Sequence, residues 1–354
     1  MTTLIRTSTN RVANLFVTLL PALFVVLVLI GMILSSIDKD PALAARNFIE
    51  GAIGSDARRA DVLMMALPML LCASGLLLTF TAGLWNIGVE GQVTMGAIFA
   101  TIIAKEVTSD ANSLLVIPAE FILAMIGGAL WAAVAAILKT KGNVNEIFGG
   151  VALNFIATNV LIYLLTGPWK SGTYPQTAVF EQPALLPRLM PGLSLSLPAI
   201  LVAVTSFVLV FFILRGTRWG LQLKAMGKSE RSAYLLGVRT SRNVLLSMML
   251  CGALAGLAGA LLVLSPIARG RLLTGVSGGV GFLGVLIVML VNTQATWVPI
   301  VALFFAIVPI GTLKLQNSMT LDASLGNVFQ SALVLAVLLA NGIRSRLQKS
   351  ASIK

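Results

Sequence analysis

The sequence predicts an all-α polytopic membrane protein with about ten transmembrane helices, because both its composition and its apolar runs depart from those of soluble proteins. Of its 354 residues 57% are apolar and 11% are charged, whereas about a quarter of the residues in a soluble domain carry charge. Apolar runs long enough to span a bilayer, roughly 20 residues each, recur along the chain. We therefore expect one transmembrane domain over residues 1–354, with any energy-coupling domain on another chain.

The same composition excludes most catalytic and metal-binding chemistry. The sequence contains no histidine, which removes imidazole bases, Ser-His-Asp triads and most zinc sites. Its two cysteines, Cys72 and Cys251, lie in apolar runs without CxxC spacing. We predict no catalytic residue, no metal site and no cofactor bound by this chain, and so a protein that is not an enzyme. The net charge of +12 is spread between apolar runs, so it indicates topology and not nucleic-acid binding.

The first half of the chain contains five apolar runs that predict one crossing each. They cover residues 12–37, 62–80, 84–104, 114–138 and 145–166. The segment 38–61 mixes acidic and basic residues with alanine and isoleucine, so we expect a surface helix on the external side. Glu120 lies near the external start of the fourth run, where we expect it to be solvated.

Five further apolar runs follow in the second half. They cover residues 198–214, 244–264, 280–291, 297–311 and 325–342. Residues 167–197 are rich in proline and predict an irregular external loop. The short runs on either side of residues 292–294 predict an inward hairpin that turns at these residues.

The charge pattern orients the predicted helices. The segment 215–243 is the longest internal hydrophilic stretch and contains seven basic residues. Lys and Arg concentrate on the cytoplasmic side of membrane proteins, so we place this segment and both termini in the cytoplasm. Apolar residues recur within it at intervals of three and seven, which predicts an amphipathic segment of one or two short helices along the inner face. These residues are Leu223, Met226, Ala233 and Leu236.

Polar residues and glycines interrupt the apolar run near residue 86. Asn86, Glu90 and Gln92 lie there among three glycines, each of which weakens a helix by roughly 1 kcal/mol. An ionisable group at the bilayer centre costs about 3 kcal/mol, so Glu90 should face protein, water or the membrane edge. Broken backbone at membrane depth is tolerated only when it is buried in protein or lines a cavity. Two interpretations stay open: a transport path lined by these residues, or a tight cytoplasmic turn with Glu90 solvated.

Other patterns indicate helix contacts. Asn154 lies in the body of a predicted helix, where an amide either bonds to a neighbouring helix or faces a path. Residues 279–284 match GxGxxG but lack the strand–helix context of a dinucleotide site, so helix packing explains them better. Small residues three and four apart let helix backbones approach closely. We assign this helix-packing role to Gly252, Gly256 and Gly259.

The residues 86–92, Asn-Ile-Gly-Val-Glu-Gly-Gln, followed by Met-Gly-Ala at 95–97, closely resemble a motif of the permease subunits of ABC importers for nucleosides and simple sugars. These subunits are related to the ribose and branched-chain amino-acid permeases. Residues 143–146 are similar to the family's fifth-helix Asn-Glu segment, and residues 224–238 to its cytoplasmic coupling loop. The resemblance covers roughly residues 62–311.

The resemblance implies an inner-membrane pathway formed by two permease subunits, driven by cytoplasmic ABC ATPases that use the ATP, and supplied by an extracytoplasmic solute-binding protein. The solute is then a nucleoside or a simple sugar. Relatives that carry nucleosides often have Gly-Phe-Asp-Gly where residues 281–284 read Gly-Phe-Leu-Gly, which leaves the solute open. We assign the substrate path to Asn86, Glu90, Gln92, Asn145, Glu146 and Asn154. We assign ATPase coupling to Gly227, Glu230, Ala233 and Gly237.

A stand-alone ion-coupled secondary transporter or channel, with Glu90 as the coupling carboxylate, is the alternative. Secondary carriers often show paired broken helices in two repeated halves. The interrupted segments near residues 88 and 281 are dissimilar and no internal repeat is evident, so the sequence favours the importer permease.

Overall fold

The computed structural model describes residues 40–268 and 270–319, together with the isolated positions 28, 31, 328, 331, 332, 335, 336, 339 and 342. Its regular elements within these residues are all helices. The all-α prediction is therefore confirmed for the part of the chain that the structure describes. The predicted helices over 12–37 and 325–342, and both termini, lie outside the two described stretches.

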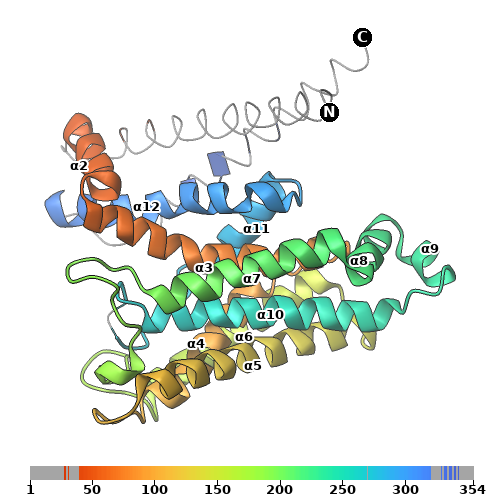
Figure 1. Ribbon diagram of the computed structural model, residues 1–354, viewed down its shortest axis with the longest axis horizontal. Coiled ribbons are helices and arrows are strands. Elements are labelled where there is room, and N and C mark those ends of the chain that lie inside the picture. The colour runs from red at the N-terminus through yellow and green to blue at the C-terminus, as the bar shows by residue number, and fades with distance from the viewer. Residues whose placement is uncertain are drawn as a thin grey trace. The chain divides into compact units, whose positions relative to one another are not determined.

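Eleven α-helices and two 3-10 turns follow one another in the described stretches (Figure 1). Six of the helices are long and apolar enough to cross a membrane, and α4 and α11 are shorter apolar helices, as expected for a polytopic membrane protein. The helices are α2 (Pro41–Ile53), α3 (Asp56–Thr81), α4 (Val89–Ala104), α5 (Ser113–Thr140), α6 (Glu146–Thr166), α7 (Leu197–Gly216), α8 (Arg218–Lys228), α9 (Glu230–Leu235), α10 (Thr240–Leu264), α11 (Val280–Leu290) and α12 (Val298–Met319), with turns η1 (Gln182–Ala184) and η2 (Ala295–Trp297).

Local capping chemistry sets several of the helix starts. The side chain of Asp40 accepts a hydrogen bond from the amide of Ala42 at 2.8 Å, and Pro41 occupies the first helical position. Asn145 caps α6 in the same way through the amide of Ile147 at 2.9 Å. Such caps satisfy amides that have no partner within the helix, and proline tolerates the first position because it lacks one.

Three helix bounds differ from the sequence prediction by five residues or more. The helix expected from residue 62 begins at Asp56, so residues 56–61 belong to α3 and not to the surface segment 38–61. The helix expected from residue 84 begins at Val89 because the chain leaves α3 in a left-handed turn at Gly83. The helix expected to end at residue 311 continues to Met319.

The chain divides into two compact units, residues 1–62 with 304–354 (unit 1) and residues 63–303 (unit 2). In unit 1, α2 packs on the second half of α12, where the ring of Phe48 meets Gly311 and a Cβ on Gly311 would lie 2.7 Å from it. The carboxylate of Glu50 accepts from Lys314 at 2.8 Å and from Arg46 at 2.8 Å. Salt bridges and ring packing thus join these two helices.

The core of unit 2 is a trio of helices, α4, α5 and α10, whose backbones touch. A Cβ on Gly96 of α4 would lie 2.2 Å from the Cα of Gly256 on α10, and a Cβ on Gly128 of α5 would lie 2.1 Å from the carbonyl oxygen of Gly252. Likewise, a Cβ on Gly259 would meet the carbonyl oxygen of Val93 at 2.1 Å. The three glycines of α10 that the sequence assigned to packing therefore lie at these helix contacts.

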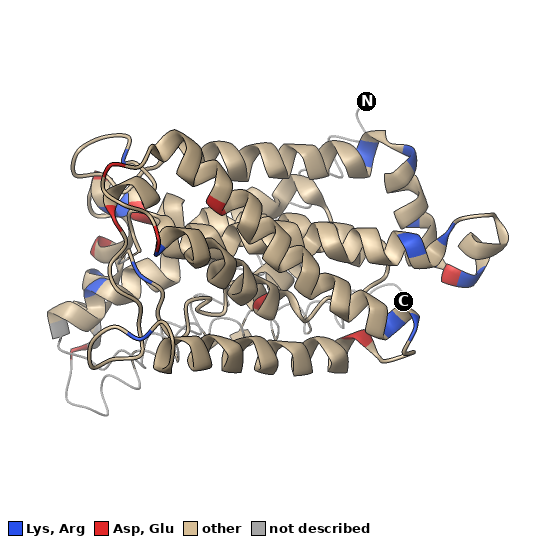
Figure 2. Cartoon of the chain, turned by 90° about the horizontal axis from the view of Figure 1, so that it is seen from below, with Lys and Arg blue, Asp and Glu red and all other residues tan. Residues whose placement is uncertain are grey.

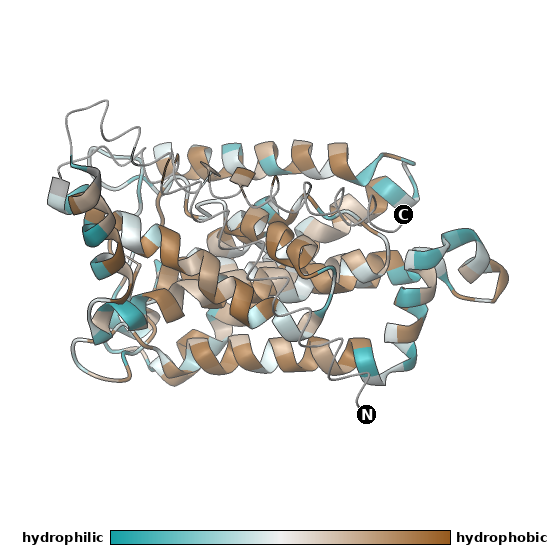
Figure 3. Ribbon diagram, turned by 90° about the horizontal axis from the view of Figure 1, so that it is seen from above, coloured by the Kyte–Doolittle hydropathy of each residue, from teal (hydrophilic) through white to brown (hydrophobic). Residues whose placement is uncertain are grey.

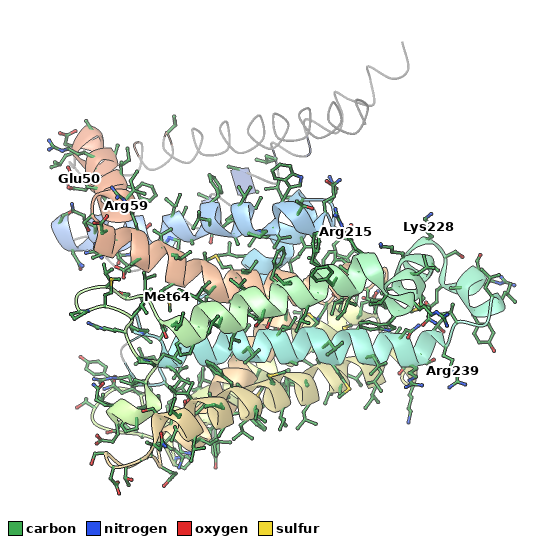
Figure 4. All side chains as sticks on the ribbon, viewed as in Figure 1. Glu50, Arg59, Met64, Arg215, Lys228 and Arg239 are labelled. Atoms are coloured by element: carbon green, nitrogen blue, oxygen red, sulfur yellow. The ribbon has the colours of Figure 1, made fainter. Side chains whose placement is uncertain are left out.

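The Lys and Arg residues of unit 2 lie near the ends of its long helices, on the short helices α8 and α9, or in connecting segments. Figure 2 shows Lys and Arg at both ends of the helices, and we call the end where α8 and α9 lie the basic end; Figure 3 shows apolar residues along the helix bodies. Arg215, Lys228 and Arg239 share this end, far from Met64 near the other end of α3 (Figure 4). The prediction of one or two short helices between residues 215 and 243 is confirmed, since α8 and α9 occupy this range.

Candidate functional site

Residues 82–88 connect α3 to α4 without helical structure, and we call this segment the α3–α4 joint. Gly83 adopts a φ of 78°, and the amides of Gly83 and Leu84 donate to the carbonyls of Phe80 and Thr79 at 3.0 and 2.9 Å. This bonding pattern is a Schellman cap, which ends a helix and usually requires glycine at the left-handed position. The sequence therefore breaks the apolar run here through a defined backbone motif.

Asn86 and Gln92 form a reciprocal amide pair across the joint. The side-chain nitrogen of Asn86 donates to the Gln92 oxygen at 3.1 Å, and the Gln92 nitrogen donates to the Asn86 oxygen at 2.9 Å. Asn86 also donates to the sulfur of Cys251 on α10 at 3.1 Å. Both amides are 1% exposed, so burial without these partners would be costly.

Asn154 on α6 bonds to the main chain on both sides of the start of α4. Its oxygen accepts from the amide of Gly91 at 2.7 Å, and its nitrogen donates to the carbonyl of Ile87 at 2.9 Å. The backbones are close here, since a Cβ on Gly150 would lie 2.6 Å from the amide nitrogen of Gly88. Asn154 thus satisfies main-chain groups that the break between helices leaves unpaired.

Glu90 binds the start of α11 through both carboxylate oxygens. One oxygen accepts from the amide of Gly279 at 2.9 Å and the other from the amide of Gly281 at 2.8 Å. A helix start favours a carboxylate because it presents unpaired amides and a partial positive charge. A Cβ on Gly281 would lie 2.6 Å from the carboxylate, so only glycine fits. The helix-packing interpretation of residues 279–284 is confirmed.

A second cluster of predicted residues lines a groove of about 440 Å³ at the basic end of unit 2. Asn145 and Glu146 lie in it beside Lys139, whose ammonium is 2.7 Å from a carboxylate oxygen of Glu146. The first residue of α9, Glu230, lines the same groove. The structure therefore brings two predicted path residues together with one predicted coupling residue. Glu146 also accepts a hydrogen bond from the backbone of Trp85, so the groove adjoins the α3–α4 joint.

The α8–α9 region, residues 217–239, contacts the joint through Gly227. A Cβ on Gly227 would lie 2.2 Å from the carbonyl oxygen of Thr81, and a Cβ on Gly83 would lie 3.1 Å from the Cα of Gly227. Ala233 is buried within the region, and Gly237 ends α9 with a φ of 84°. Any displacement of α8 at this close contact would move the joint with it.

The tip of α9 exposes apolar side chains. Tyr234, Leu235 and Leu236 are 68%, 77% and 82% exposed. Of the four apolar residues that recur at intervals of three and seven, Leu223, Met226 and Ala233 are buried, whereas Leu236 follows the end of α9 and is exposed. Adjacent exposed apolar residues of this kind mark a surface that contacts a membrane or another protein.

Residues 58–338 match the family described as "Branched-chain amino acid transport system / permease component". The chain belongs to this permease family. The permease is 32% identical over 319 residues to the glucose ABC transporter permease protein of Haloferax volcanii, covering 86% of this chain and 82% of that relative.

Two further relatives of the permease cover most of both chains. The guanosine ABC transporter permease protein of Bacillus subtilis is 26% identical over 299 residues, 83% of this chain and 84% of its own. The nucleoside ABC transporter permease protein of Lactococcus lactis is 23% identical over 355 residues, 98% and 96% of the two chains. No solved structure matches the permease.

Glu120 of the permease contradicts the prediction of a solvated position. Its side chain is 0% exposed, and neither carboxylate oxygen has a hydrogen-bond partner among the described residues. The reason is tertiary: Glu120 lies one turn before Ala124, whose carbonyl oxygen would be 2.1 Å from a Cβ on Gly256, so it is on the face of α5 that packs against α10. The local signal is the small residues Ala124 and Gly128, one and two turns later.

Sequence reasoning also missed Trp131 on α5. Its indole nitrogen lies beside the joint, 3.1 Å from where a Cβ on Gly91 would be, and it has no hydrogen-bond partner in the described part of the permease. The signal was an aromatic residue in a run otherwise rich in alanine, which is too weak to single it out.

Proposed function

We propose that this chain is the transmembrane permease subunit of an ATP-driven ABC importer that carries a nucleoside or a simple sugar inward across the cytoplasmic membrane. Membership of the permease family and the glucose, guanosine and nucleoside permeases among its relatives support this function. A second permease subunit, a cytoplasmic ABC ATPase that binds and hydrolyses ATP, and an extracytoplasmic solute-binding protein complete the transporter.

The main structural support for this proposal is the exposed tip of α9, taken together with the membership of the permease family. Tyr234, Leu235 and Leu236 offer apolar surface next to the cations of the α8–α9 region, which we assign to the cytoplasm and to the ATPase. Gly227 then relays movement of α8 to the α3–α4 joint through its contact with Thr81. Rigid-body rotation about an interface is a common form of conformational switching, and we propose that ATPase closure is transmitted in this way.

The positions of the predicted path residues divide them into two roles. Asn86, Gln92, Asn154 and Glu90 form hydrogen bonds in and around the joint, so we assign them to holding the joint in shape beside the path. Asn145 and Glu146 are also bonded within the chain, to Ile147 and Lys139, but they line a polar groove, and we assign this groove to contact with a hydroxylated solute or with the ATPase.

The contacts of Glu90 also bear on the ion-coupled alternative. Both of its oxygens accept main-chain hydrogen bonds from the start of α11, so an ion bound there would compete with those donors for the carboxylate. Uptake in vesicles that contain the whole transporter distinguishes the two functions. We expect uptake to require ATP on the side of the membrane where the ATPase lies. Uptake that follows a proton or sodium gradient without ATP would favour the alternative.

A substitution at the α9 tip tests ATPase binding directly. Leu235→Glu places a charge on the exposed apolar surface, and we expect the ATPase to be lost on purification while membrane insertion stays normal. Met190→Glu is the matched control, because it adds the same charge to a 55% exposed residue in the loop 167–197. If both variants retain the ATPase equally, the α9 tip is not part of the surface that binds the ATPase.

The solute is identified in proteoliposomes that contain the permease subunits, the ATPase and the binding protein. Nucleosides and simple sugars are added one at a time, and the transported one should stimulate ATP hydrolysis and accumulate inside. Stimulation by amino acids alone would leave the permease class intact and overturn the solute class.

A further inference from the structure

A basic pocket of about 330 Å³ lies between α8 and the start of α10. It is separate from the groove that contains Asn145, Glu146 and Glu230, since the two share no lining residue. Arg239, at the start of α10, marks its position in Figure 4. Its principal lining residues are Trp219, Gln222, Arg239, Arg242, Asn243 and Leu246.

The wall of this pocket is fixed by a chain of hydrogen bonds between the two helices. The indole nitrogen of Trp219 donates to the side-chain oxygen of Asn243 at 3.1 Å, and the Asn243 nitrogen donates to the oxygen of Gln222 at 3.1 Å. Asn243 is 4% exposed. The pocket is therefore formed by packed, hydrogen-bonded residues and not by loose surface side chains.

The charge of the pocket is positive and lacks a counter-ion. Arg239 and Arg242 are exposed, and within the described residues the ion pairs involve neither of them. The first turn of α10 adds the partial positive charge of a helix start at the same place. Two arginines without an ion-pair partner among the described residues, lining one pocket beside a helix start, favour an anion with several acceptor oxygens, and phosphate is the commonest such group.

The position of the pocket indicates where this phosphate comes from. One and two turns beyond Arg242, Leu246 and Leu250 are 36% and 40% exposed on the same flank of α10, a helix long and apolar enough to cross a membrane. Trp219 lies at the junction, as aromatic residues do at membrane surfaces. The pocket thus opens where α10 passes from the basic end of unit 2 to an exposed apolar flank.

We propose that this pocket binds the phosphate of an anionic phospholipid headgroup, with an acyl chain of the same lipid along Leu246 and Leu250. Basic pockets beside transmembrane helices bind such headgroups because charge attraction and acyl-chain contact act together. A free phosphate would satisfy only the arginines. The apolar tip of α9 is better suited to a protein partner, because it protrudes whereas the pocket is concave. A lipid bound here would brace α8 against α10.

The test measures lipid binding to the purified full-length chain in detergent. Phosphatidylglycerol should bind and raise the melting temperature, whereas phosphatidylcholine and inorganic phosphate should not. In the double variant Arg239→Gln/Arg242→Gln we expect phosphatidylglycerol to bind about tenfold or more weakly, since each basic residue near an anionic surface adds on the order of 1 kcal/mol.

The matched control is Lys228→Gln/Arg231→Gln, which removes two charges from the same end but outside the pocket. Affinity close to wild type in this control supports the proposal. Equal weakening in both double variants overturns it, because general surface charge would then explain the binding. Stabilisation by inorganic phosphate equal to that by the lipid also overturns it, in favour of a soluble anion site.

A second measurement needs no variant. A photoactivatable phosphatidylglycerol is cross-linked to the wild-type chain and the modified peptides are mapped. Cross-links within residues 219–250 support the proposal, and cross-links confined to other helices overturn it. If Arg239→Gln/Arg242→Gln binds lipid normally but no longer retains the ATPase, the pocket belongs to the protein partner and the lipid assignment is overturned.

Discussion

Glu90 on α4 and Glu120 on α5 are both carboxylates within the helix bundle of unit 2, but their polar surroundings are opposite. Each oxygen of Glu90 accepts a main-chain hydrogen bond from the start of α11. Glu120 is 0% exposed, and its two oxygens have no partner in the described residues. Both carboxylates lie beside apolar helices. The difference between them is whether the neighbouring element supplies hydrogen-bond donors.

This contrast separates a carboxylate that stabilises the fold, Glu90, from one that destabilises it, Glu120. The start of α11 offers unpaired amides, and Gly281 leaves room for the side chain of Glu90 to reach them. Glu120 lies on the face of α5 that packs against α10, where no described residue donates a hydrogen bond to it. Burial of a polar group costs free energy unless it is hydrogen-bonded, so replacing the two residues should change stability in opposite directions.

The largest effect is expected from Glu90→Leu. This change leaves the amides of Gly279 and Gly281 without an acceptor, at about 1–3 kcal/mol for each buried donor. We expect the free energy of unfolding, measured by chemical denaturation in detergent, to fall by about 2–6 kcal/mol. If Glu90→Leu is as stable as the wild type but no longer transports the solute, Glu90 acts in transport and not in holding α4 to α11.

Gly281→Ala tests the same contact from the other side and should have a smaller effect. The added Cβ would lie 2.6 Å from the Glu90 carboxylate and 2.8 Å from its backbone nitrogen, and such overpacking costs typically 1–3 kcal/mol. Gly216→Ala is the control, because no atom lies within 4 Å of its Cβ position. Melting temperatures that agree between the two variants would show that α4 and α11 are not in tight contact.

Glu120→Met should raise stability. The thioether has a similar length, and it removes a buried carboxyl group that lacks hydrogen bonds, which we expect to increase the free energy of unfolding by about 1 kcal/mol. The measurement is the melting temperature in detergent beside that of Glu90→Leu. A decrease would mean that Glu120 has a partner in the assembled transporter, which purification with the other subunits would then identify.

The smallest effect concerns Glu50 of unit 1, a carboxylate paired with cations at the surface. Lys314 and then Arg46 lower its pKa from the ordinary 4.5 to about 2. Because the pKa of Glu50 is lower in the folded state, the ionised carboxylate contributes to folding stability above about pH 4.5, and this contribution is lost as the pH falls toward 2. The gap in melting temperature between wild type and Glu50→Gln should therefore be small at pH 7 and shrink at pH 3. A gap that widens on acidification would contradict the pairing.

The sequence predicts the helices well because each spanning helix needs an apolar run of its own. The start of α6 was placed to within one residue, since Asn145 is a strong cap next to such a run. The start of α4 was placed five residues early, because apolar residues continue through the Schellman cap at Gly83 and only glycine marks the break.

The site was less predictable because its contacts are distant in sequence. Asn86, Glu90 and Gln92 stand out as polar residues in an apolar run, but the amide that binds Glu90 lies 189 residues further on. The burial of Glu120 likewise depends on α10, which packs on the same face of α5 and lies far along the chain. Hydropathy and spacing identify such residues as unusual and cannot say which partner, if any, each one has.

The glycine contacts of unit 2 leave no layer of side chains between the main chains of α4, α5 and α10. Sliding one of these helices along another would drive carbonyl oxygens into Cα atoms, because interfaces packed this closely do not deform gradually. A transport cycle must therefore carry the three helices as one rigid body. Helix α6 is held to α4 in a similar way, through Gly150 and Asn154. The rearrangement is therefore expected in α7, of which only Ala199, Ala203, Val210 and Leu214 are buried.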